Sequence, residues 1–123
     1  MGKRKTALLI ESHPWLRQTL RQLLADEGFE VVAEAVSVMD GVRQAVDLQP
    51  GVVVVDADLA EMSGSLLGQM IQMLVPRTDV ILLVDDTRAY GQLEQAGQVA
   101  ACIDKRLAGH LLAPALKRLF END

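Results

Sequence analysis

The residues Gly51-Val52-Val53-Val54-Val55-Asp56 decide the fold that this sequence predicts. A short, continuous run of β-branched residues after Pro50 is typical of a strand whose two faces are both buried, as in a parallel sheet covered by helices. Asp56 ends that run. In open α/β sheets, ligands bind outside the carboxyl ends of the strands, so Asp56 is a candidate functional residue before any motif is considered.

Predicted strands and helices alternate along the rest of the chain. Further β-leaning apolar runs predict strands at residues 6–10, 31–35, 80–84 and 99–103. Helices are expected from Pro14 to Gly28, from Ser37 to Pro50, from Ser63 or Ser65 to Pro76, over residues 88–96, and from Gly109 or His110 onward. Ser12 or His13 can cap the first of them. This repeated βα order predicts an α/β fold with a doubly wound, five-stranded parallel sheet.

The composition fits one domain over residues 1–123. Half of the 123 residues are hydrophobic, which is enough for a single core and too little for two. The net charge of −5 provides no basic stripe for phosphate backbones, so we expect no nucleic-acid binding by this chain alone. The single cysteine, Cys102, lies in an apolar run and is expected to be a small buried residue in a reduced, cytoplasmic protein.

The amino-terminal residues give no sign of membrane targeting. Lys3, Arg4 and Lys5 precede an apolar run that stops at Glu11, which is too short for a signal peptide or a spanning helix. We therefore expect no contact with a membrane.

Charged and polar residues follow several of the predicted strands. Glu11 and Ser12 follow the first strand, Asp56 ends the third, Asp85 follows the fourth and Lys105 follows the fifth. Because the carboxyl ends of parallel strands meet at one edge of a sheet, we expect these side chains to converge on one site.

Three stretches around these residues resemble the receiver domain of bacterial two-component response regulators. Glu11-Ser12-His13-Pro14 is similar to the acidic segment of the subfamily with a C-terminal helix-turn-helix output domain. Val55-Asp56-Ala57-Asp58-Leu59-Ala60-Glu61-Met62-Ser63-Gly64 is similar to the phosphoacceptor loop, and Cys102-Ile103-Asp104-Lys105 to the lysine strand. The resemblance covers nearly the whole chain and implies a flavodoxin-like, CheY-like fold with strand order 2-1-3-4-5.

The resemblance also implies a role for each of these residues. Asp56 would accept a phosphoryl group from a sensor histidine kinase or another phosphodonor, and Lys105 would pair with that group or with Asp56. Glu11, Asp56 and the backbone carbonyl of Asp58 would be ligands of Mg²⁺, which neutralises the charge on a transferred phosphoryl group.

Four positions depart from the family pattern. Ser12 replaces a second acid and removes a full negative charge, which weakens the implied Mg²⁺ site. Val84 stands where the family has a Thr or Ser that donates a hydrogen bond to the phosphoryl group. Asp85 replaces a small residue and would repel an incoming dianion. Cys102 replaces the aromatic switch residue.

Two hypotheses follow from this pattern. The first is a receiver that accepts a phosphoryl group on Asp56 in an atypical or impaired way. The alternative is a pseudo-receiver, which would act without phosphorylation as a protein-interaction or dimerisation module. It would bind a partner or its own copy through the fourth helix, the fifth strand and the fifth helix, and Asp85 would supply the missing charge.

An enzymatic role is the least favoured alternative. No Gly-x-Gly-x-x-Gly turn follows the first predicted strand, where Glu11-Ser12-His13-Pro14 stands instead. No Ser/His/Asp order or metal-ligand cluster indicates hydrolysis. We therefore do not expect this chain to be an enzyme.

Overall fold

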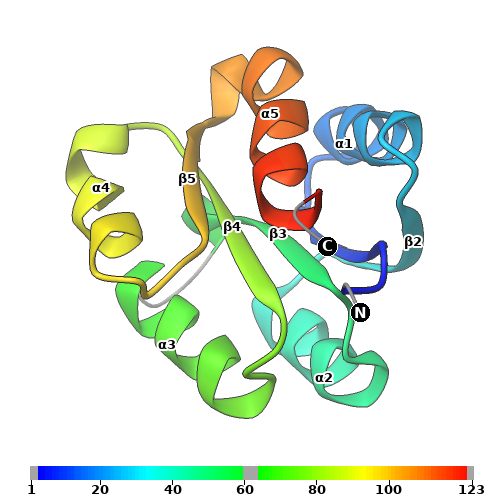
Figure 1. Cartoon of the computed structure of the whole chain (residues 1–123), viewed down its shortest axis with the longest axis horizontal. Helices are drawn as coiled ribbons and strands as arrows, with labels where there is room; N and C mark the ends of the chain where they lie inside the picture. The colour runs from blue at the N-terminus through cyan, green and yellow to red at the C-terminus, as the bar shows by residue number, and fades with distance from the viewer. Residues whose placement is uncertain (1–2, 60–63, 122–123) are drawn as a thin grey trace.

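A five-stranded, all-parallel sheet with the strand order β2-β1-β3-β4-β5 forms the centre of the molecule (Figure 1). The computed structural model describes residues 3–59 and 64–121. The strands are β1 (Thr6–Ile10), β2 (Glu30–Ala35), β3 (Val52–Asp56), β4 (Asp79–Val84) and β5 (Ala101–Asp104). The predicted fold class and strand order are confirmed.

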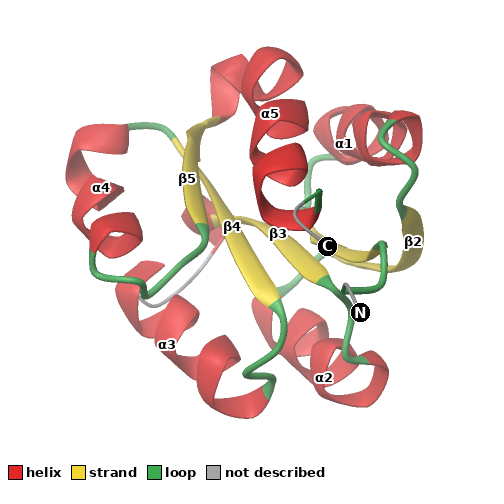
Figure 2. Ribbon diagram, viewed as in Figure 1, coloured by secondary structure: helices red, strands yellow, loops and turns green. Residues whose placement is uncertain are grey.

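Helices cover both faces of the sheet (Figure 2). They are α1 (Pro14–Asp26), α2 (Val38–Leu48), α3 (Gly64–Leu74), α4 (Thr87–Gln95) and α5 (Ala108–Phe120). Two short 3₁₀ helices, η1 (Ala57–Leu59) and η2 (Lys105–Leu107), follow β3 and β5. Both lie at the carboxyl ends of strands, where the sequence places the candidate site residues.

The side chains of β3 alternate between two hydrophobic cores. Val52 and Val54 pack in the core that is shared with α1 and α5, whereas Val53 and Val55 pack in the core that is shared with α2 and α3. All four valines are fully buried. The β-branched run is therefore a central strand with two apolar faces, as its sequence predicts.

The amino end of β3 lies against the chain that leads into β1. The amide of Gly51 donates a hydrogen bond to Thr6 Oγ1 at 2.9 Å, and the hydroxyl of Thr78 donates to the carbonyl of Pro50 at 2.7 Å. A Cβ atom on Gly51 would lie 2.1 Å from the backbone oxygen of Arg4 and 3.1 Å from the ring of Phe120. Only glycine allows this close approach of the two backbones.

Two predicted helix caps are confirmed. His13 Nδ1 accepts a long hydrogen bond of 3.5 Å from the amide of Leu16, and Ser37 Oγ accepts one of 3.3 Å from the amide of Asp40. Pro14 occupies the first turn of α1, where a missing N–H leaves no bond unmade.

Some element boundaries differ from those predicted. β5 begins at Ala101, two residues later than predicted, because its register with β4 starts with the pair Ile81 and Ala101. α5 begins at Ala108 and continues through Pro114. α3 begins at Gly64, and the alternative start at Ser63 lies outside the described residues, as does Met62.

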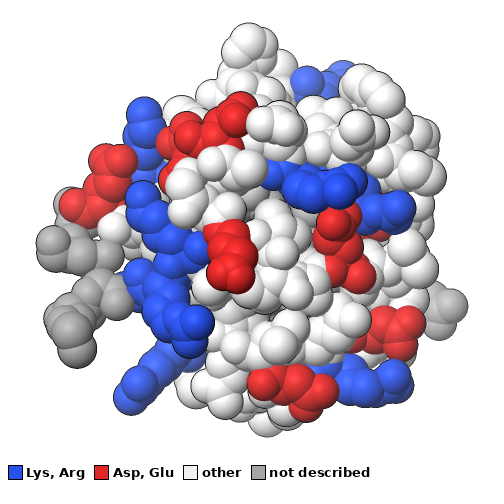
Figure 3. All heavy atoms as spheres, turned by 90° about the vertical axis from the view of Figure 1, so that its right-hand side faces the viewer, with Lys and Arg blue, Asp and Glu red and all other residues white. Residues whose placement is uncertain are grey.

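Charges of both signs lie on the face formed by α1 and β2 (Figure 3). Arg17 Nε lies 3.3 Å and Arg21 Nε 3.5 Å from the two carboxylate oxygens of Glu34. These ion pairs connect α1 to β2, which is an edge strand of the sheet. Among the described residues, no helix is long and apolar enough to cross a membrane.

Candidate functional site

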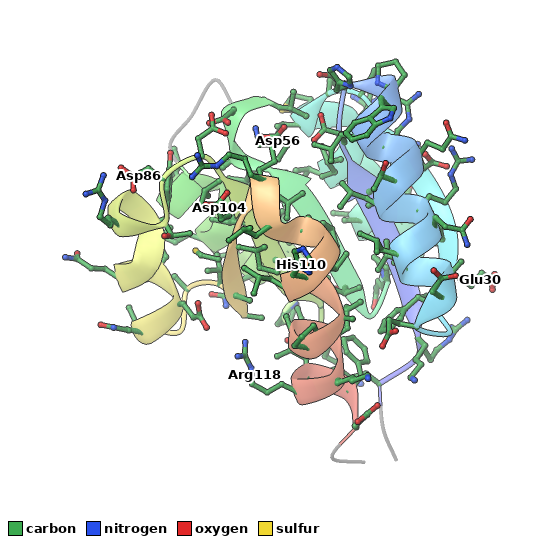
Figure 4. The ribbon with its side chains drawn as sticks, turned by 90° about the horizontal axis from the view of Figure 1, so that it is seen from above. Glu30, Asp56, Asp86, Asp104, His110 and Arg118 are labelled. Atoms are coloured by element: carbon green, nitrogen blue, oxygen red, sulfur yellow. The ribbon has the colours of Figure 1, made fainter. Side chains whose placement is uncertain are left out.

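Asp56 lies at the carboxyl edge of the sheet, at the opposite end from Arg118 of α5 (Figure 4). It is the last residue of β3, whereas Glu11 directly follows β1 and Lys105 directly follows β5. The side chain of Asp56 is 6% exposed, and its Oδ1 accepts a hydrogen bond of 2.9 Å from the amide of Asp58. Asp56 therefore also orders the first turn of η1.

Lys105 contacts three carboxylates at once. Its Nζ lies 2.9 Å from Asp56 Oδ1, 2.6 Å from Asp58 Oδ2 and 3.5 Å from Asp85 Oδ1. The hydrogen bond from Lys105 holds the pKa of Asp58 below its usual value. Burial lowers the pKa of Lys105, but the hydrogen bonds with Asp56 and Asp58 outweigh it and raise that pKa overall. The predicted contact between Lys105 and Asp56 is present.

Glu11 is a buried carboxyl group beside Asp56. It is 1% exposed, and its Oε1 accepts a hydrogen bond of 3.0 Å from the amide of His13. Its other oxygen, Oε2, is buried and has no hydrogen-bond partner among the described residues. Burial, followed by the neighbouring Asp56 carboxylate, raises the pKa of Glu11 to about 7. Part of the Glu11 population therefore carries a proton at neutral pH.

An open pocket of about 380 Å³ lies over these groups. Its lining includes Glu11, Asp56 and Lys105. The further lining residues are Ser12, His13, Trp15, Leu16 and Arg106. Trp15 is 69% exposed at this pocket, so its fluorescence can report on binding there.

The four departures from the family pattern have different surroundings. Ser12 is exposed at the pocket, whereas Val84 is fully buried in the core beside α2 and α3 and has no group to donate. Asp85 is 71% exposed and lies in ion-pair contact with Lys105. Lys105 thus partly neutralises the negative charge that Asp85 adds to this site.

Cys102 lies apart from the pocket, under α4. The expectation of a small buried residue is wrong: Cys102, in the edge strand β5, is only partly buried. Its Sγ donates a hydrogen bond of 3.3 Å to the carbonyl of Tyr90, and burial raises the pKa of the thiol to about 11. A thiol with this pKa is not a reactive nucleophile at neutral pH.

The side chain of Asp58 is the site group that sequence reasoning missed. Only its backbone carbonyl was expected to take part, yet its carboxylate makes the shortest contact with Lys105. The sequence signal for this contact is the spacing of two residues between Asp56 and Asp58. The turn of η1 brings the carboxylates of both residues to Lys105.

The residues implied as ligands of Mg²⁺ lie at one place, since Glu11 and Asp56 line the same pocket and the amide of Asp58 donates a hydrogen bond to Asp56. Among the residues that the structure describes, no three or more His, Cys, Asp or Glu side chains form a group that could hold a metal ion. The carboxylates of Asp56 and Asp58 both contact Lys105, and Ser12 contributes no charge. The unpartnered Glu11 Oε2 is the one feature that favours a cation here.

Comparisons with known proteins identify the family of this chain. Residues 7–117 match the family described as response regulator receiver domain. A nitrate/nitrite response regulator protein homolog from Haemophilus influenzae is 35% identical over 65 residues, which cover 52% of this chain and 31% of that protein. The chemotaxis protein CheY from Thermotoga maritima is 28% identical over 82 residues, which cover 67% of each chain.

Solved structures share the fold. The Salmonella typhimurium RcsB response regulator superimposes with a TM-score of 0.84 at 20% identity, over 97% of this chain and 60% of that one. A LuxR-family DNA-binding response regulator from Staphylococcus aureus gives a TM-score of 0.80 at 22% identity, over 94% of this chain and 98% of that one.

Proposed function

Since the chain belongs to the response regulator receiver domain family of two-component systems, we propose that it is a phosphorylation-independent receiver. In this proposal it works in the cytoplasm as a protein-interaction module and not as an enzyme. Receiver domains interact with histidine kinases or other phosphodonors, and this chain would bind such a partner without taking a phosphoryl group from it. The rest of this subsection gives the reasons.

The engagement of Lys105 is the observation that carries the proposal. A lysine ammonium has three N–H donors, and three carboxylates already surround this one. A phosphoryl group on Asp56 would need the same ammonium, so it would have to displace Asp58 and Asp85. Val84 offers no replacement donor, because its side chain is apolar and buried.

Electrostatic repulsion also disfavours an incoming phosphoryl group. Asp58 and Asp85 would face the dianion from two sides of Lys105. For each pair of unit charges about 4 Å apart near a protein surface, the repulsion costs on the order of 1 to 4 kcal/mol. The acids that neutralise Lys105 would thus become obstacles to the reaction.

Phosphorylation of Asp56 is the second candidate function, and the open pocket favours it. Asp56 and Lys105 both line this pocket, so a small phosphodonor has access to the carboxylate. In this case the receiver would be phosphorylated slowly and to a low level.

A phosphodonor assay separates the two functions. The protein is incubated with MgCl₂ and either acetyl phosphate or a histidine kinase, and its intact mass is recorded under conditions that preserve acyl phosphates. We expect no acid-labile mass increase. An increase that disappears in Asp56→Asn would contradict the proposal and favour the second candidate.

A triple variant provides the matched positive control. Ser12→Asp adds the second acid, Val84→Thr adds a hydroxyl donor, and Asp85→Ala removes the extra negative charge. We expect this variant to form the adduct under the conditions that leave the natural sequence unmodified. If neither protein forms it, the assay conditions are inadequate and the donor is changed.

The face formed by α4, β5 and α5 is the proposed interaction surface. Arg118 of α5 pairs with Glu94 of α4 at 3.5 Å, and Glu94 also accepts a hydrogen bond of 3.2 Å from the amide of Cys102 in β5. Leu111 and Leu107, about two and three helical turns before Arg118 along α5 and η2, are 39% and 45% exposed. The exposed leucines could pack against the same leucines of a second copy, and the charged residues beside them could form the polar rim of that interface.

Leu111→Asp is therefore expected to shift the protein toward the monomer. Sedimentation velocity over a concentration series measures the effect, and we expect the dissociation constant of the dimer to rise at least about tenfold, since a charge replaces an apolar contact. Met73→Asp is the matched control, because Met73 is 83% exposed on α3. An equal effect of both variants, or a monomer at every concentration, would contradict this assignment.

A further inference from the structure

Exposed apolar side chains gather on the side of the molecule that α2 and α3 cover. Both helices pack on the same face of the sheet, in the core that contains Val53 and Val55, and they contact each other directly (Figure 1). Most of the large apolar side chains that are exposed among the described residues belong to these two helices or to their immediate flanks. Clustered apolar side chains on a surface mark interaction sites, whereas single ones are ordinary.

The side of α3 that faces α4 is fixed by two residues. Gln72 donates a hydrogen bond of 3.0 Å to the carbonyl of Gly97, in the link between α4 and β5, and a Cβ atom on Gly68 would lie 2.8 Å from the same link. Both positions directly follow a fully buried residue of α3, Leu67 or Ile71. Successive residues are about 100° apart around a helix, so the residue before each buried position faces the other way, toward α2.

Leu66, Met70 and Met73 form a row along the side of α3 that faces α2. Their spacing of i, i+4 and i+7 places them on one stripe of the helix. Leu66 is 53% and Met73 83% exposed, whereas Met70 is partly buried against the core. The contact of α3 with α2 therefore leaves most of this row open.

α2 has a matching row that faces α3. Both helices connect parallel strands and cover the same face of the sheet, so they run in the same direction. The residues that follow the buried Val38 and Ala45 of α2 thus face α3, just as the residues after the buried positions of α3 face α4. They are Met39, which is 61% exposed, and Val46, which is 40% exposed.

The two rows together form the α2–α3 face, which consists of Met39, Val46, Leu66, Met70 and Met73. Each row extends from i to i+7, which is about 10 Å or two helical turns. An amphipathic helix with apolar residues at i, i+3 or i+4 and i+7 has a stripe of the same length and can pack across both rows. Methionine side chains are flexible and suit such binding surfaces.

Charge favours a basic partner at this face. α2 contains Asp40, Arg43 and Asp47, whereas α3 has no charged residue. Arg43 already pairs with Asp40 at 3.2 Å, but Asp47 has no ion pair within the part of the chain that the structure describes. Asp47 directly follows Val46 in the last turn of α2, where the helix dipole favours a cation and no basic residue is present. A lysine or arginine of a partner would supply that cation.

We propose that the α2–α3 face binds a basic, amphipathic α-helix of another protein. The inference goes beyond the proposed function, because it uses neither Lys105 nor the surface formed by α4, β5 and α5. A second copy docked through the same face would bring another unpaired Asp47 to it and no cation. The net charge of −5 also attracts a cationic partner.

Methionine methyl signals test this proposal. The protein is labelled with ¹³C at its methionine methyl groups, and the signals of Met39, Met70 and Met73 are assigned by Met→Leu substitution. The probe is a helical peptide of about five turns with one stripe of leucines flanked by lysines. We expect all three signals to shift saturably, with a dissociation constant at or below about 100 µM. A peptide with glutamates in place of the lysines should bind at least about tenfold more weakly.

A pair of double variants locates the binding site. Leu66→Gln with Met73→Gln removes two exposed apolar contacts and adds no charge, so the lysine peptide should bind at least about tenfold more weakly. Leu107→Gln with Leu111→Gln is the matched control at exposed leucines of η2 and α5, and it should leave the affinity unchanged. Circular dichroism checks that both variants are folded.

Three results would overturn the proposal. One is an equal loss of affinity in the two double variants. Another is equal binding of the lysine peptide, the glutamate peptide and a lysine peptide whose leucine stripe is broken by reordering its residues. The third is a set of methionine signals that shift with protein concentration in the absence of peptide, because a second copy of the chain would then cover the α2–α3 face.

Discussion

Gly51→Ala is expected to lower the free energy of unfolding by about 3 kcal/mol or more, a large part of the stability of a domain of this size. The added Cβ would lie 2.1 Å from the carbonyl oxygen of Arg4, which is backbone and cannot rotate away. Relief of the clash requires that the chain before β1 move away from β3. That movement would strain the hydrogen bond between the amide of Gly51 and Thr6 Oγ1.

Gly91→Ala is the matched control for this prediction. Gly91 lies inside α4, and no atom lies within 4 Å of the Cβ that would be added there. Alanine in place of a helical glycine with free space around its Cβ should stabilise the domain by about 0.5–1 kcal/mol. Urea denaturation measures both variants. A Gly51→Ala variant as stable as the unmodified protein would show that the two backbones do not approach as the structure describes.

Glu11→Gln is expected to stabilise the protein at alkaline pH and to have a much smaller effect at acidic pH. The pKa of Glu11 is raised in the folded state from 4.5 to about 7, so folding favours its protonated form. The contribution of protonated Glu11 to the free energy of unfolding is complete below about pH 4.5 and is lost as the pH rises through about 7. The full loss corresponds to about 3 kcal/mol, at 1.36 kcal/mol per pKa unit.

Unfolding free energies at pH 5 and pH 8 test this prediction. Glutamine keeps an oxygen for the amide of His13 and cannot ionise, so the gain from Glu11→Gln should be about 2–3 kcal/mol larger at pH 8 than at pH 5. Glu30→Gln, at an exposed residue of β2, should have the same effect at both pH values. A gain from Glu11→Gln that does not depend on pH would refute the explanation by burial.

Most of the fold could be predicted because its signals are local and strong. The valine run indicates a strand buried on both faces, and Pro14, Ser37 and Gly28 mark helix ends through the limited conformations or hydrogen bonds of their residue types. The position of β5 was less predictable, since a short edge strand is defined by its pairing with β4 and not by its own composition.

The candidate site could be predicted only as a set of residues. Parallel strands bring Glu11, Asp56 and Lys105 to one edge, which the order of elements already implies. The sharing of Lys105 among three carboxylates could not be predicted, because it depends on the turn of η1 and on the side-chain position of Asp85. The sequence predicted Asp85 as a source of repulsion, whereas in the folded protein it is also a partner of the lysine.

The ion pairs that Arg17 and Arg21 make with Glu34 affect how copies of this chain can meet. β2 is an edge strand, and the unpaired backbone groups of an exposed edge can pair with a strand of another molecule and extend the sheet. Such extension would bury or displace the charges on β2 and on the adjacent helix. Growth into fibres along this edge is thereby disfavoured.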